Sequence, residues 1–146
     1  MILQGICHSF IEELFSGTHD LTADTLKMAL YTSSADLSPS ATTVYTTAGE
    51  ATGTGYTAGG VTVTTVAVTL YSETARGVVY VDFDNPEWAS STITARGAML
   101  YNSSQSNAAI AVFDFGTEKV SSESTFTATL PSANKDNALI RLEVEV

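Results

Sequence analysis

The chain has 146 residues, with six Lys and Arg against sixteen Asp and Glu, which gives a formal net charge of -10. Phosphate binding needs clustered Lys and Arg, so the charge balance argues against nucleic acid and anionic membranes as partners. Hydrophobic residues make up 44% of the chain and charged residues 15%, which is enough for one domain to bury a core without disulfides or metal.

The first predicted element is a helix over residues 7–16, and Gly17 is its predicted stop. Apolar side chains recur there at helical spacing: Ile6, Phe10, Ile11 and Leu14. We interpret the apolar residues 1–6 as an N-terminal arm, because they are too few and too uncharged to be a secretory signal. The single cysteine, Cys7, excludes an internal disulfide, and no run approaches the ~18 apolar residues of a membrane span.

A strand is predicted over residues 26–31, where the hydrophobic period changes to two. Residues 33–60 are rich in turn residues and lack strong periodicity. We interpret them as a long surface loop that orders against neighbouring subunits, with a floppy connector as the alternative. The subunit-contact candidates lie in the helix and in this loop: Phe10, Leu14, Tyr45, Gly53, Gly55, Tyr56, Gly59 and Gly60.

The rest of the chain alternates valine and threonine with the period of a strand. Val61 and Val63 share one parity, whereas residues 66, 68 and 70 share the other, so a β-bulge is predicted at Thr64–Thr65. Pro86 predicts a turn that tucks Trp88 over the edge of the core. Further strands are predicted at residues 78–83, 93–101, 109–115, 126–130 and 139–146. The pattern predicts a single all-β domain over residues 1–146, an antiparallel β-sandwich or jelly-roll-like fold.

Candidate chemical groups are few. The Gly-rich residues 53–60 are followed by a strand pattern and lack the Lys of a phosphate-binding loop, so close backbone approach is the better explanation. His8 and His19 lack the spacing of a zinc site. Asp82 and Asp84 share one face of a strand, but no calcium-loop spacing accompanies them. No serine-nucleophile motif is present, so we expect no catalytic residues, no metal and no cofactor.

Several blocks of the sequence resemble a family of small virion proteins of tailed bacteriophages. The blocks follow one another in the family's order from about Phe10 to the end: residues 19–21, 24–35, 53–60, 93–98, 101–102 and 109–116. The family offers no catalytic residues to carry over, and residues 1–6 match nothing in it.

The resemblance implies a non-enzymatic structural protein of the virion, assembled in the cytoplasm of the bacterial host. Its partners would be further copies of itself and other virion proteins, such as the major capsid protein or the portal and tail proteins. We expect a capsid decoration (cement) subunit. A neck or tail component, and a receptor- or carbohydrate-binding module on a tail fibre, remain open alternatives. A hydrolase of host surface polymer would need paired carboxylates in a cleft.

Overall fold

Strands account for 51% of the residues and helix for 6% in the computed structural model, which describes residues 1–145. The elements in chain order are β1 (Gly5–Ile6), α1 (His8–Phe15), β2 (Leu26–Tyr31), β3 (Gly53–Thr54), β4 (Val61–Val63), β5 (Thr65–Ser72), β6 (Arg76–Phe83), β7 (Glu87–Asn102), β8 (Ala108–Thr127) and β9 (Arg141–Glu145). The helix predicted over residues 7–16 and the strand predicted over residues 26–31 are confirmed.

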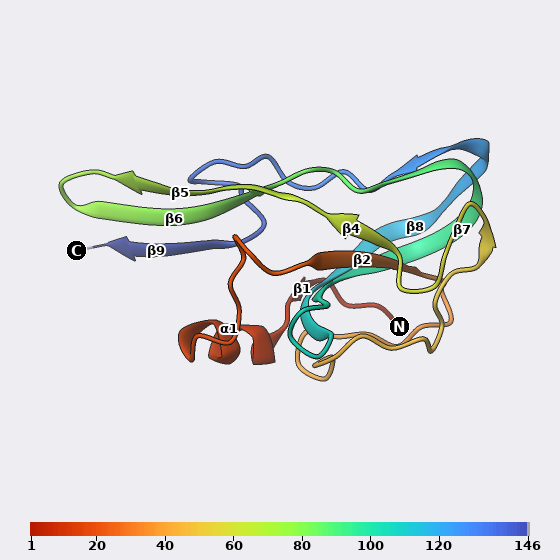
Figure 1. Cartoon of the computed structure of the whole chain (residues 1–146), viewed down its shortest axis with the longest axis horizontal. Coiled ribbons are helices and arrows are strands. Elements are labelled where there is room, and N and C mark those ends of the chain that lie inside the picture. The colour runs from red at the N-terminus through yellow and green to blue at the C-terminus, as the bar shows by residue number, and fades with distance from the viewer. Residues whose placement is uncertain (146) are drawn as a thin grey trace.

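The strands form two antiparallel sheets, and the predicted all-β, sandwich-like class is confirmed. The larger sheet has the order β1-β8-β7-β2-β4, and β3 pairs with another part of β7. The smaller sheet has the order β5-β6-β9. Figure 1 shows the smaller sheet extending away from the larger one, on the side of the molecule where α1 lies. We call the sheet β5-β6-β9 the wing.

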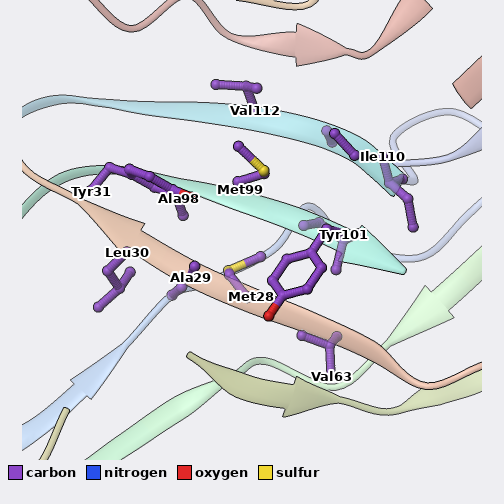
Figure 2. Packing of buried hydrophobic residues seen from close by; sticks show 14 of the residues in the cluster. Met28, Ala29, Leu30, Tyr31, Val63, Ala98, Met99, Tyr101, Ile110 and Val112 are labelled. Atoms are coloured by element: carbon purple, nitrogen blue, oxygen red, sulfur yellow. The ribbon is translucent and has the colours of Figure 1, made fainter. Parts of the chain in front are cut away.

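The core lies mainly in the larger sheet, around β2, β7 and the first part of β8. Met28 and Ala29 are consecutive in β2, so their side chains point to opposite faces of the sheet, and both are fully buried. The sheet is therefore covered on both faces at this point, as the packing in Figure 2 illustrates. Val81 and Phe83 of β6 belong to the same buried cluster, so the base of the wing shares this core.

The strands of the second half are longer than the sequence predicts. Residues 109–115 and 126–130 were predicted as two strands, but residues 108–127 form the single strand β8, which pairs with β7 along its length. The prediction of a separate strand at 126–130 is therefore wrong. Most residues between these two segments are exposed, so no apolar alternation marks them as strand. The strand predicted at 139–146 is observed as β9, and Val146 lies outside the described residues.

The parity break at Thr64 is where the chain passes from one sheet to the other. Val61–Val63 pairs with β2 in the larger sheet, and Thr65–Ser72 pairs with β6 in the wing. The register of the second pairing shifts between Thr65 and Ala67, which is the irregularity that a bulge produces. The predicted bulge is therefore present, and it accompanies a change of sheet, which sandwiches commonly achieve with bulges or bends.

Residues 1–6 lie along the body of the protein, although the sequence suggests a free arm. Ile2 is buried and forms a bridge with Leu37, and the N–H of Leu3 donates to the Leu37 carbonyl at 2.9 Å. The short strand β1 then pairs with β8 at the edge of the larger sheet.

Candidate functional site

Helix α1 presents one side to the core and the other to solvent. Phe10 is 1% exposed and its ring lies 4.9 Å from that of His19, so it is not available to a neighbouring subunit. Leu14 is partly buried against the core. Ile11 and Phe15, by contrast, are 47% and 74% exposed, and they form the side of α1 that a partner could reach.

In the long loop, Glu50 gathers three of its neighbours. Its carboxylate accepts hydrogen bonds from the hydroxyls of Tyr45 and Tyr56, at 2.6 and 2.7 Å, and from the N–H of Gly59 at 2.7 Å. Burial, followed by these bonds to Glu50, raises the pKa of both tyrosines, so their hydroxyls stay protonated as donors. Three of the predicted contact residues therefore hold the loop together internally.

The same residues fasten the loop to the larger sheet. The Tyr56 hydroxyl accepts the N–H of Leu30 at 3.0 Å, and the Tyr101 hydroxyl donates to the Gly59 carbonyl at 2.7 Å. The rings of Tyr45 and Tyr101 stack with centroids 4.8 Å apart. The loop is therefore held to the sheet by contacts within its own chain.

Two glycines of this loop lie where the backbone approaches the sheet too closely for a side chain. Gly60 has a φ of +73°, and a Cβ there would lie 1.7 Å from the Met28 carbonyl oxygen. At Gly53, with φ +149°, a Cβ would lie 2.1 Å from the Thr92 carbonyl oxygen. Close backbone approach, as the sequence suggested, accounts for these glycines. Gly53 and Gly55 remain exposed, and their role as contact residues stays a prediction.

His19 lies in a buried polar cluster. Its Nδ1 accepts a hydrogen bond from the side-chain amide of Asn102 at 2.9 Å, so Nε2 carries the proton and donates to Glu13 at 2.9 Å. The Asn102 amide also donates to Asp24 at 2.7 Å, and this bond is the main reason that the pKa of Asp24 lies below its usual range. Every polar atom of the His19 ring is thus paired within the protein, as expected of a structural histidine.

The remaining chemical candidates do not converge. Cys7 is buried, and burial raises the pKa of its thiol to about 11, which keeps it from the reactive thiolate form at neutral pH. Asp82 of β6 pairs with Ala67 of β5, and the N–H of Asp84 donates to the Thr64 carbonyl at 3.0 Å. Among residues 1–145, no group of three or more His, Cys, Asp and Glu side chains is placed to hold a metal ion.

The wing has one apolar face that the rest of the chain leaves largely uncovered. Leu70 of β5, Val79 of β6 and Leu142 of β9 lie opposite one another in register and form one cross-strand row. Val68 pairs with Val81 in the next row toward the body, and Gly77 pairs with Val144 in the next row toward the tip. Val81, next to the body, is 5% exposed, whereas the other members of these rows are largely open to solvent: Val79 40%, Val68 43%, Leu142 50%, Val144 62% and Leu70 68%.

A groove of about 800 Å³ separates this face from α1. Its walls are mostly apolar and come from α1, the three wing strands and the segment leading into β9. Asp20 and Arg141 are the charged residues among its lining. The groove and the apolar face that continues beyond it form one surface, which we call the wing surface and define by its most exposed members: Ile11, Phe15, Val68, Leu70, Val79, Leu142 and Val144.

The opposite face of the wing is charged and partly covered. Arg76 bonds Glu143 and also Asp136, the latter at 3.3 Å. Lys135 lies 5.6 Å from the centre of the Tyr71 ring. The segment between β8 and β9 thus packs on this face, whereas the wing surface has no such cover within residues 1–145.

Part of the wing surface is visible in the sequence as the period-two pattern of β5. The alternation of Val66, Val68 and Leu70 predicts that one face of β5 is buried, and the structure leaves all three exposed. No periodicity in a single chain distinguishes a face that its own core covers from one that a partner covers.

Comparison with protein-family models, with curated proteins and with solved structures gives no match to this chain. Within the described residues, no helix combines the length and the apolar character needed to cross a membrane.

Proposed function

We propose that the protein is a non-enzymatic structural subunit of a tailed-bacteriophage particle, and specifically a capsid decoration subunit. The observation that carries the proposal is the wing surface, a continuous apolar face left open to solvent. Apolar patches of this extent in soluble proteins mark sites of protein association or ligand binding. The resemblance of the sequence blocks to small virion proteins gives the setting in which such contacts are made.

The polar interior supports a structural role. The carboxylate of Glu50 and the ring of His19 are engaged by the chain's own donors and acceptors, and these bonds make the body rigid. A body of this kind with one uncovered apolar face is suited to a subunit that assembles through that face without changing shape.

A carbohydrate-binding module would use Tyr45, Tyr56, Tyr71 or Trp88, and it is less well supported because all of these except Tyr71 are engaged in the interior of the chain. Trp88 is 2% exposed and packs against Tyr56 and Phe126, with ring centroids 6.3 and 5.8 Å away. Tyr45 stacks on a neighbouring ring in the loop. A neck or tail component, in contrast, could use the same wing surface, and copy number separates it from a decoration subunit.

The test is to purify particles of a phage that encodes this chain and to count its copies by quantitative mass spectrometry. Decoration predicts copies on the order of hundreds, because each capsid contact repeats with the symmetry of the shell. A handful of copies would assign the chain to the neck or tail. Absence from purified particles would refute the structural role.

A further inference from the structure

We propose that the wing surface is a self-association interface, on which a second copy of this chain packs face to face across a two-fold axis. The inference rests on the proposed function in that it names the partner of the same surface. Three features of the molecule support it: the area of the surface, the absence of charged side chains from its cross-strand rows, and the shape of the sheet that carries it.

The area suits a dimer interface. The exposed fractions of the side chains that define the wing surface correspond to roughly 600 Å² of apolar area, near the ~800 Å² that each partner contributes to an interface of standard size. It lies at the upper end of the ~300–600 Å² that the largest patch of a typical monomer covers. Apolar rims such as the open walls of the groove would add to the area that a partner buries.

The charge distribution favours a second copy. A chain with a net charge of -10 repels its own copies, so two copies can meet closely only through a surface without carboxylates. The wing strands provide one, because Glu143 and Glu145 alternate with Leu142 and Val144 and therefore point to the other face. Asp20 and Arg141 are the charged residues that line the adjoining groove. A partner for this surface must itself offer a large uncharged apolar patch, and the chain offers one to every other copy.

The shape of the sheet allows the wing surfaces of two copies to pack against each other. Cross-strand rows of Leu and Val form the inner faces of two-layer sandwiches, where sheets pack about 10 Å apart. A two-fold axis lays the rows of one wing on those of its partner, and residues that contact one another then do so in both directions.

The experiment measures the association of the full-length chain by sedimentation velocity over a range of concentrations. Two variants place a charge on the wing surface, Leu70→Lys and Val144→Lys. The matched control is Val120→Lys, because Val120 is as exposed as Leu70, at 68%, but lies on β8 outside the wing surface. All three variants add one positive charge to an acidic chain, so the repulsion between copies that arises from net charge decreases equally in each.

We expect the native chain and Val120→Lys to form dimers with the same dissociation constant, and each wing variant to raise it by about tenfold or more. A native chain that stays monomeric, or a control that dissociates like Leu70→Lys, would overturn the inference. If the native chain is monomeric but Leu70→Lys is lost from particles, the surface binds a different virion protein and the proposed function stands. If dimers form but particles lack the chain, the inference stands and the proposed function fails.

Discussion

Replacing Glu50 by alanine removes the acceptor shared by Tyr45, Tyr56 and Gly59, and we expect it to destabilise the fold by about 3 kcal/mol. Each buried donor left without an acceptor costs about 1–3 kcal/mol. The Tyr56 hydroxyl and the Gly59 N–H lose their acceptor in a partly buried site, whereas the Tyr45 hydroxyl can turn to water. A loss of this size is a large fraction of the ~5–15 kcal/mol that holds a typical domain folded.

The isosteric change Glu50→Gln should cost less, about 1 kcal/mol. Its amide oxygen can take the place of Oε1, which accepts from Tyr56 and Gly59, and its amide nitrogen then faces Tyr45, whose hydroxyl can turn to accept. Glu118→Ala is the surface control, because Glu118 accepts one exposed bond, from Ser33 at 3.0 Å, and should change stability by under about 0.5 kcal/mol. Urea unfolding measures all three. If Glu50→Ala costs no more than Glu118→Ala, the loop is not held by this carboxylate.

Three further predictions concern stability. Gly60→Ala should destabilise the fold by more than about 3 kcal/mol, because it forces a side chain onto a positive φ and places its Cβ 1.7 Å from the Met28 carbonyl oxygen. Gly77→Ala is the control and should be near neutral, because nothing lies within 4 Å of its Cβ. Equal losses of stability in thermal melts would contradict this prediction. Asn102→Ala should destabilise the fold by about 3 kcal/mol at neutral pH. Part of that loss should disappear below about pH 4, because the lowered pKa of Asp24 gives stability that is present above its usual pKa and is lost as pH falls. Urea titrations of the native chain and the variant at both pH values test this, and the same loss of stability at both would count against the bond between Asn102 and Asp24. The raised pKa of Tyr56 means that the stability it contributes is full below the ordinary tyrosine pKa of about 10 and is lost as pH rises above it. The part of the tyrosinate absorbance that Tyr56→Phe removes should therefore appear together with loss of the circular dichroism signal. Its appearance while the chain is still folded would contradict the burial of Tyr56.

The hydrophobic period was the informative signal in the sequence. It predicted the elements correctly where the chain covers its own apolar face. The helix around Phe10 and the strand at residues 26–31 follow directly from spacing, since both pack on the core. The length of β8 does not follow from spacing, because the residues from Gly116 to Thr125 are mostly exposed. They pair through the backbone, and a side-chain pattern does not report backbone pairing. The break in the alternation at Thr64 could be seen in the sequence. The change of sheet at this position could not, because it depends on which strands lie nearby.

The contact candidates show a second limit. Glycine and tyrosine in the segment 33–60 suggested a loop that needs a neighbour to become ordered, and composition alone allows that. The structure instead uses Gly60 for close packing on β2 and Tyr56 for a bond to Glu50. Both functions require the same residue types, because a glycine that fits against a partner and one that fits against its own sheet meet the same steric condition. Only the coordinates of the opposing backbone distinguish them.

The wing is the place where local pattern and global fold disagree, and that disagreement carries the functional argument. Natural sequences place apolar side chains where the fold covers them, and departures concentrate at functional sites. Leu70 and Val144 depart from this rule on a sheet whose other face carries the Arg76–Glu143 ion pair and is partly covered by the segment before β9. Random exposure would scatter apolar residues over both faces, whereas here they share one face and one set of cross-strand rows. This order is the reason that we propose an equally apolar partner for the surface, and in an acidic chain the proposed partner is a second copy, because its own wing surface is the patch that matches.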